Sequence, residues 1–306
     1  MNMIIIGAGL SGLIAANVLI RHRPKVIEAK TSLPNNHSAV LRFRTSVVGD
    51  ATGIPFKKVN MIKTTVPWLN PVADALAYSF KTTREYRSDR SVTKGELITE
   101  TRYIAPPDLI ERLASSADII FNCSMSGREF KHPSLGMDFK YISTIPMPTL
   151  MNMLDYPKVD QIAFRFGKGK NLHAKIENCE AYVSLIVVDP GLPFSRISIT
   201  GNDLIVEGTE ELDETILPNV AKLLGFGEWQ FNNPTIHKQA YAKIGPIDDD
   251  ERRRFMAWAT DKFGIYSLGR FATWRPSLLL DDLIQDLRLI EGWMARDDRY
   301  DLQRKR

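Results

Sequence analysis

The chain opens with a pattern of short apolar runs separated by a glycine-rich turn. Residues 3–6 are apolar, residues 7–12 contain three glycines, residues 13–20 are mostly apolar, and a third short run ends at Glu28. Three or four apolar residues bounded by turn residues are typical of a buried strand, whereas the longer middle run suits a helix. The pattern therefore predicts a strand, a tight turn, a helix and a second, parallel strand.

Later apolar runs predict the rest of an α/β architecture. Residues 117–124 are typical of a buried parallel strand that returns to the first sheet, and residues 141–148 of a strand that is broken by prolines and crosses between two lobes. Residues 160–208 alternate apolar and polar positions between turn residues, which indicates an antiparallel sheet. Residues 265–270 predict a last strand, which leads into a helix at residues 278–294.

The three glycines of the first turn have the G-x-G-x-x-G spacing of a dinucleotide-binding loop. In that setting Gly7 makes the turn, Gly9 allows the backbone to approach a pyrophosphate, and Gly12 allows the helix to pack against the strand. The helix N-terminus adds N–H groups and a positive dipole end. Glu28 ends the second strand, where its carboxylate can accept hydrogen bonds from ribose hydroxyls. The alternative is an ordinary βαβ turn.

Composition and charge exclude few classes of protein. The chain has 306 residues, enough for two lobes, with 44% hydrophobic and 25% charged residues. A net charge of +4 is compatible with an anionic partner such as DNA but does not establish one. The two cysteines, Cys123 and Cys179, and the scattered histidines have no metal-ligand spacing. We expect a cytoplasmic chain without signal peptide, membrane span or metal, and composition leaves its oligomeric state open.

Several arginines are candidates for binding an anion. Arg42 and Arg44 would share one face of an extended segment and contact either a pyrophosphate or an anionic substrate, the alternative being a solvated strand face. Arg196 lies among strand residues and needs a partner, either a substrate anion or a structural carboxylate. Residues 81–94 carry further basic side chains, for which a solvated surface is preferred to a DNA contact.

Near the other end of the chain, Gly269 and Arg270 follow the last predicted strand. A strand that reaches a glycine and then turns into a helix can bind a phosphate group, so this segment is a second candidate phosphate site besides the turn at residues 7–12. Two such places, about 260 residues apart, suit FAD, which is long enough to span two lobes. We therefore predict an interleaved arrangement. The FAD-binding domain comprises residues 1–70, 110–145 and 260–306, and a smaller antiparallel-sheet substrate domain comprises residues 71–109 and 146–259.

Three segments resemble the amine-oxidase and UDP-galactopyranose mutase superfamily of FAD-dependent flavoproteins. They are residues 7–13 with Glu28, the crossover at 141–146, and residues 268–274. The resemblance implies that Arg270 meets the FAD pyrophosphate and that the helix start near Leu280 lies under the isoalloxazine ring. The superfamily's glycine pair after the acidic residue is missing, and the chain is shorter than most members. The FAD-contacting residues that we predict are Gly7, Gly9, Leu10, Ser11, Gly12, Glu28, Arg42, Gly269, Arg270 and Leu280.

A narrower resemblance, to the compact FAD-dependent lyases of bacteriophage thymidine hypermodification, covers the whole chain without a diagnostic motif. It implies oxidation of a C–N bond in a glycine-modified thymine of phage DNA, giving aminomethyl-deoxyuridine and glyoxylate in the host cytoplasm. Arg44, Arg196 or Lys243 would bind the substrate carboxylate, and Tyr241 and Trp274 would form an apolar wall. The alternatives are a UDP-sugar mutase-like flavoenzyme and a non-catalytic, flavin-bound subunit.

Overall fold

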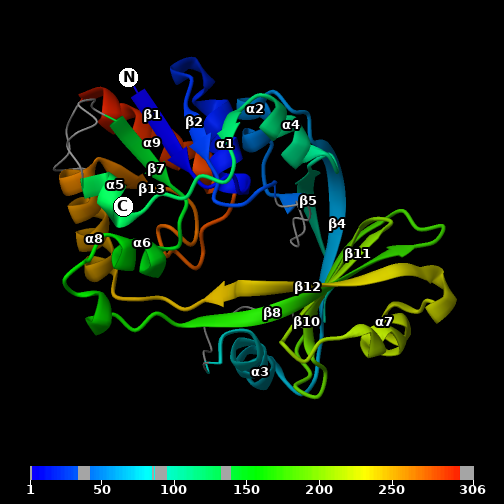
Figure 1. The fold of residues 1–306 in the computed structure, drawn as a ribbon. Coiled ribbons are helices and arrows are strands. Elements are labelled where there is room, and N and C mark those ends of the chain that lie inside the picture. Colours follow the sequence, from blue (N-terminus) through cyan, green and yellow to red (C-terminus); the bar gives the residue numbers. More distant parts are fainter. Residues whose placement is uncertain (1, 34–41, 85, 87–94, 132–138, 297–306) are drawn as a thin grey trace.

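The computed structural model describes residues 2–33, 42–84, 86, 95–131 and 139–296, except the side chains of residues 240, 241 and 296. Within these residues the chain forms a five-stranded parallel sheet and an eight-stranded mixed sheet, drawn in the upper and lower parts of Figure 1. The predicted α/β fold, a Rossmann-like domain interleaved with a second sheet, is confirmed.

The parallel sheet has the order β13–β7–β1–β2–β6. Its strands are β13 (Ile265–Ser267), β7 (Phe139–Ser143), β1 (Asn2–Ile6), β2 (Lys25–Ile27) and β6 (Asp118–Ile120). β1 is buried on both faces, because Met3 and Ile5 belong to one hydrophobic cluster and Ile4 and Ile6 pack in another. β6 joins this sheet as predicted, but as an edge strand with Ile120 40% exposed, so the expectation of a buried strand is wrong.

Helices cover both faces of the parallel sheet. The cluster around Ile5 contains side chains of α1 (Leu10–Val18), α2 (Val47–Thr52), α4 (Leu109–Ser115) and α9 (Asp282–Arg296). The cluster around Ile6 contains side chains of α5 (Gly127–Lys131), α6 (Met147–Met153) and α8 (Asp249–Phe263). Parallel strands buried between two helical layers are the arrangement that a continuous apolar run such as 3–6 predicts.

The second sheet has the order β12–β8–β11–β10–β9–β4–β5–β3. Its strands are β12 (Phe231–Ile244), β8 (Phe166–Ile176), β11 (Asp203–Gly208), β10 (Phe194–Gly201), β9 (Ala181–Val187), β4 (Lys57–Val66), β5 (Ile98–Ile104) and β3 (Arg42–Phe43). All pairs are antiparallel except β4 with β9. This sheet therefore departs from the predicted small antiparallel one in having a parallel pair and more strands than the first.

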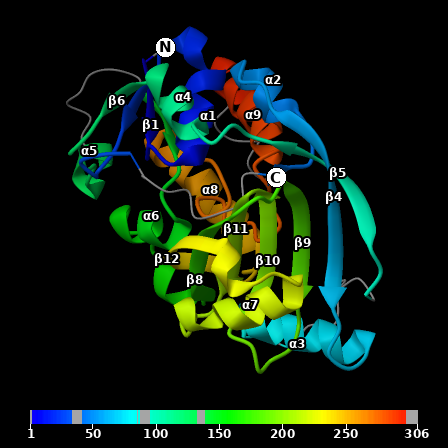
Figure 2. The same cartoon turned by 90° about the vertical axis from the view of Figure 1, so that its right-hand side faces the viewer.

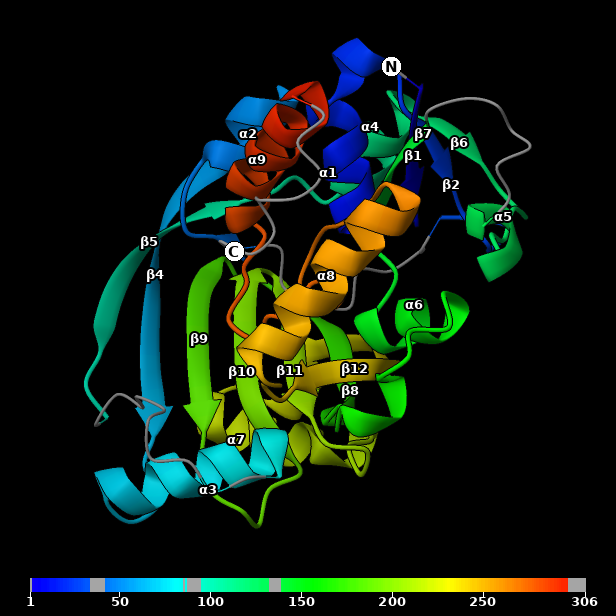
Figure 3. The ribbon, with the colours of Figure 1, turned by 90° about the vertical axis from the view of Figure 1, so that its left-hand side faces the viewer.

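The two faces of the second sheet differ in polarity. Ile197 and Ile199 of β10 point to a hydrophobic cluster completed by α7 (Leu217–Leu224), whereas Arg196 and Ser198 point the other way. Figure 2 shows α7 in front of the strands, and Figure 3, from the opposite side, shows α3 (Pro71–Thr83) there with α8 above it. The polar face of the second sheet is thus the one that faces α3 and the half of the molecule containing the parallel sheet.

Short 3-10 helices complete the described fold: η1 (Ile20–His22), η3 (Val159–Gln161), η4 (Glu214–Ile216) and η5 (Glu228–Gln230).

The predicted domain boundaries stay a prediction, although β3 and β4 lie in the second sheet and not with the rest of residues 1–70. The predicted extended segment before Arg42 and most of the basic segment 81–94 lie outside the described residues. None of the described helices has the length and apolar character needed to cross a membrane.

Candidate functional site

The three glycines of the first turn have different surroundings. Gly7 has φ +99°, and a Cβ there would lie 2.3 Å from Oγ1 of Thr144. A Cβ on Gly12 would lie 1.9 Å from the carbonyl oxygen of Gly7. At Gly9, no atom of the described residues comes within 4 Å of the Cβ position. Two of the glycines are therefore required by the fold, and the one between them faces open space, where a phosphate needs it.

The first helix presents its N-terminus at the same place. Gly9 is the N-cap of α1 and no side chain caps that end, so the first N–H groups remain available to an anion. The Glu28 carboxylate accepts hydrogen bonds from the backbone N–H groups of Ala8, at 2.8 Å, and Lys30, at 2.9 Å. Each oxygen keeps a second lone pair that a ribose hydroxyl can use. The loop and the carboxylate therefore fit the adenosine diphosphate part of a dinucleotide.

The segment after β13 lies beside this loop. Gly269 has φ +92°, and a Cβ there would lie 2.8 Å from Oγ of Ser11 in the first turn of α1. The Arg270 guanidinium donates from Nε and Nη2 to the carbonyl oxygen of Leu278, at 3.0 and 2.9 Å. Leu280, half-buried, packs near the start of α9. The structure thus brings together two predicted FAD-contacting segments from opposite ends of the chain.

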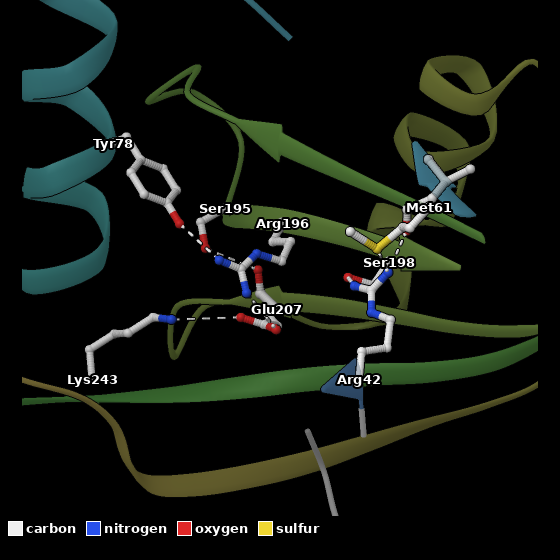
Figure 4. Close-up of polar contacts among 9 residues, drawn as sticks. Arg42, Met61, Tyr78, Ser195, Arg196, Ser198, Glu207 and Lys243 are labelled. Atoms are coloured by element: carbon white, nitrogen blue, oxygen red, sulfur yellow. Dashed lines mark hydrogen bonds and ion pairs between the residues drawn. The ribbon is translucent and has the colours of Figure 1, made fainter. Parts of the chain in front are cut away.

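A cluster of charged side chains lies on the polar face of the second sheet. We call Arg42, Arg196, Lys243, Arg270 and the carboxylate of Glu207 the cation cluster. Arg196 Nη1 lies 3.4 Å from Oε1 of Glu207, and Lys243 Nζ lies 3.8 Å from Oε2. Figure 4 shows Arg196 and Lys243 pointing at Glu207 from different strands, with Arg42 close by. Four cations facing one carboxylate leave a net positive charge.

Three uncharged groups, from Tyr78, Ser198 and Val183, complete the surroundings of the cluster. Tyr78 of α3 lies with its hydroxyl 3.4 Å from Arg196 Nη2, and Arg42 donates to the hydroxyl of Ser198 at 2.8 Å and to the carbonyl of Val183 at 3.0 Å. Nε of Arg196 is buried and has no hydrogen-bond partner among the described residues. A buried, unsatisfied donor in a positively charged cluster favours the binding of an anion.

Burial and mutual charge shift the pKa values of the cluster. Burial, with a further contribution from Arg196, lowers the pKa of Arg42 to about 10. Burial alone would raise the pKa of Glu207, but Arg196, Lys243 and Arg42 outweigh it, so that the pKa falls below its ordinary value. Burial also lowers the pKa values of Lys243 and Arg270, against the opposing effect of Glu207. Glu207 is therefore ionised near neutral pH and partly balances its neighbours.

A pocket of about 300 Å³ opens beside the cluster, between the C-terminal end of α3 and the strands β8, β11 and β12. Glu207 and Lys243 belong to both the cluster and the pocket wall. Its other charged side chains are Lys81, Arg84, Lys168 and Glu210. Among the described residues of the lining, Phe166 and Ala242 are the ones with apolar side chains. The pocket therefore suits a small polar ligand with negative charge.

Three predicted substrate residues lie elsewhere or cannot be placed. The side chain of Arg44 is exposed and β3 ends at Phe43, so Arg42 and Arg44 do not share a strand face. Trp274 is 1% exposed, and its Nε1 donates to the carbonyl of Gly245 at 3.0 Å, which makes it a core residue and not an open wall. Tyr241 lies in β12, and its side chain is outside the described part of the chain.

Sequence analysis missed two residues of this region, Glu207 and Tyr78, and placed Lys81 only in the basic segment 81–94, for which a solvated surface was preferred. The sequence could have identified Glu207 as a partner of Arg196, because the two residues are paired in the hairpin formed by β10 and β11. An arginine and a glutamate at paired positions of one hairpin indicate a cross-strand ion pair. Tyr78 had no such signal, and Lys81 had none beyond its charge, since α3 reaches the sheet only through tertiary packing.

Comparison with known structures places the fold among flavoproteins. No family model matches the chain, and no curated protein matches its sequence. A structure of reduced UDP-galactopyranose mutase matches with a TM-score of 0.67 and 12% identity, covering 96% of this chain and 94% of that chain. A probable FAD-dependent monooxygenase from Pseudomonas aeruginosa matches with a TM-score of 0.54 and 11% identity, covering 98% and 89%.

A flavoprotein/dehydrogenase from Cytophaga hutchinsonii matches with a TM-score of 0.51 and 11% identity, covering 98% of this chain and 81% of that chain. At these identities the likeness defines the fold, which is that of FAD-binding flavoproteins. The glycine loop, Glu28 and the start of α1 fit that cofactor on the geometry described above.

Proposed function

We propose that the chain is an FAD-dependent oxidoreductase that oxidises a C–N bond of an amine carrying an anionic group. The observation that supports this most directly is the cation cluster, in which Arg196 and Lys243 face a single carboxylate and Nε of Arg196 is buried without a partner. A substrate carboxylate would supply the missing negative charge and the missing acceptor. The particular substrate that we propose is a thymine in DNA whose 5-methyl carbon carries a glycine.

The residues that would hold FAD are the glycine loop, the N-terminus of α1, Glu28, Arg270 and the start of α9. Bound FAD supplies the hydride acceptor. The protein's own part is to bind the substrate carboxylate at Arg196 and Lys243, so that the α-carbon of the amine is held in one orientation. Loss of hydride from that carbon leaves an imine of the substrate, which water hydrolyses to a free amine and glyoxylate.

The experiment is an anaerobic absorption titration of the FAD-loaded protein with a thymidine oligonucleotide that carries the linked glycine. The expected result is bleaching of the flavin band with release of glyoxylate. The same oligonucleotide with unmodified thymidine is the control and should leave the band unchanged. The Arg196→Gln variant should keep its flavin but bleach about a hundredfold more slowly, because a charge-assisted contact is lost. A band that persists in the wild type rejects this substrate.

A second candidate is a mutase acting on a sugar nucleotide, and one observation favours it. The alignment with the reduced UDP-galactopyranose mutase structure covers 94% of that chain, so the short length of this chain does not count against such an activity. The cation cluster would then meet a diphosphate. Turnover of UDP-galactopyranose by the protein with pre-reduced flavin, and not with oxidised flavin, would support the mutase.

A further inference from the structure

Lys81 is a buried cation that the proposed oxidation does not use. It lies in the last turn of α3, is 9% exposed, and contributes to the wall of the pocket. Its Nζ donates to the carbonyl oxygens of Asp189 at 2.6 Å and Val187 at 3.3 Å. Within the described part of the chain, no carboxylate forms an ion pair with it. Lysines that are buried without a counter-ion are expensive in their charged form.

The two hydrogen bonds of Lys81 are compatible with the neutral form of the amine. A neutral amine has two N–H donors and one lone pair, and two backbone carbonyls accept from Nζ. In the neutral form one lone pair remains that neither carbonyl uses, on a residue that lines the pocket. Burial lowers the pKa of Lys81 to about 8, against a smaller opposing effect of Asp189. A substantial fraction of neutral amine is therefore present slightly above neutral pH.

The rest of the pocket selects the charge of that ligand. Among the described residues, Arg84, Lys168 and Lys243 line it together with two carboxylates, those of Glu207 and Glu210. With Lys81 counted as neutral, this described lining still carries three positive and two negative groups. Hydroxyl groups of Thr82, Ser195 and Thr209 line it as well. A small molecule with one carboxylate and a polar carbonyl fits this lining.

We propose that Lys81 is a carbonyl-reactive amine and that this pocket takes a small aldehyde acid or keto acid, bound as an imine. The lone pair of Nζ attacks the carbonyl carbon and the C=O π bond opens, and one proton passes from nitrogen to oxygen through the solvent to give a carbinolamine. Its hydroxyl then leaves as water with a proton from the solvent, while nitrogen loses its remaining proton to the solvent and the C=N bond forms. The step involves no oxidation or reduction.

The inference rests on the proposed function in one respect only, the origin of the ligand. Oxidation of a glycine-type amine releases an aldehyde acid next to this pocket, since Glu207 and Lys243 belong to both sites. Capture by Lys81 would hold that product away from the flavin. The reactivity of Lys81 itself needs neither flavin nor amine substrate, so it can be tested without them.

The test is reductive trapping of the flavin-free and the FAD-loaded protein with glyoxylate and cyanoborohydride at pH 8, followed by peptide mapping. The expected result is a carboxymethyl group on Lys81, formed at least about tenfold faster than on the exposed Lys58, because burial lowers the pKa of Lys81 and the basic lining binds the carboxylate of glyoxylate. Acetaldehyde, which lacks the carboxylate, should show a smaller preference for Lys81, because the basic lining no longer contributes. The Lys81→Arg variant keeps a donor for both carbonyls and should show no label at this position.

Two results would overturn the proposal. One is labelling of Lys81 no faster than of Lys58 in the wild-type protein, a comparison that needs no variant and therefore no assumption about folding. The other is equal preference for glyoxylate and acetaldehyde, which would remove the role of the basic lining. Selective trapping together with a flavin band that the modified oligonucleotide does not bleach would support the reactive lysine and reject the proposed oxidation.

Discussion

Gly269, just after the last strand of the parallel sheet, packs so closely on Ser11 that a Cβ would lie 2.8 Å from its Oγ. Ser11 belongs to the first turn of α1, so this contact joins the two ends of the chain at the nucleotide loop. The contact is made possible by the missing side chain of Gly269 and by its φ of +92°, which other residues rarely adopt.

The first prediction concerns that contact. Gly269→Ala should lower the free energy of unfolding by about 2 to 4 kcal/mol, since it adds a clash with Ser11 to the cost of a positive φ, and it should weaken FAD binding. Gly225→Ala is the matched control, because Gly225 has φ +73° but open space around its Cβ position. Denaturant titration should show a loss of only about 1 kcal/mol there, with flavin affinity unchanged. Equal losses in both variants would contradict the close contact.

The second prediction separates the cofactor role of one glycine from the structural role of another. Gly9→Ala places a methyl group in open space, so the unfolding free energy should change by less than about 1 kcal/mol while FAD affinity falls at least about tenfold. Gly12→Ala should instead destabilise the fold, because its Cβ would lie 1.9 Å from the carbonyl of Gly7. Thermal unfolding of the flavin-free protein and FAD titration measure the two effects. An unchanged FAD affinity in Gly9→Ala would rule out a pyrophosphate at the loop.

The third prediction concerns pH. The pKa of Glu207 is lowered by its cationic neighbours from an ordinary value of 4.5, so the ionised form stabilises the folded chain above that pH. Glu207→Gln should therefore reduce the unfolding free energy at pH 7 by about 1 to 3 kcal/mol. As the pH falls below 4.5 and through the lower pKa of the folded state, this difference between wild type and variant should shrink. Urea titrations between pH 3 and about 7 would measure it. A constant difference would mean that Glu207 is not part of a charged cluster.

The sequence predicted the parts of the fold that depend on local spacing. The βαβ unit at residues 2–28 follows from apolar runs and glycines that are neighbours along the chain, and the structure has its strands and helix there. The strands of 160–208 follow from alternation in the same way. Sheet membership was harder to predict. β4 pairs in parallel with β9, more than a hundred residues later, and nothing in the residues of β4 encodes that partner.

The candidate site likewise combines residues that local sequence patterns identify with residues that only the tertiary fold brings together. Arg196 was identified from its charge within a strand, and its partner Glu207 could have been found by extending the hairpin register. Arg42 lies in β3 at the edge of the same sheet as Glu207, and Arg270 follows β13 of the parallel sheet, so only the tertiary fold brings these two arginines near Glu207. Trp274 was predicted to form an apolar wall of the active site because it is an aromatic residue close to Arg270 in the sequence. In the structure its ring packs on Phe164 in the core.

The last prediction uses that tryptophan. Because Trp274 is buried and its indole N–H is bonded to the carbonyl of Gly245, Trp274→Phe should leave that carbonyl without its partner and lower the unfolding free energy by about 1 to 3 kcal/mol. Trp229→Phe is the control, since Trp229 is 73% exposed and its replacement should change stability by less than about 0.5 kcal/mol. If Trp274 acts only in the core, the variant should retain its FAD affinity at temperatures where it is folded. A folded Trp274→Phe protein with unchanged stability but weakened flavin or substrate binding would return this residue to the active-site wall.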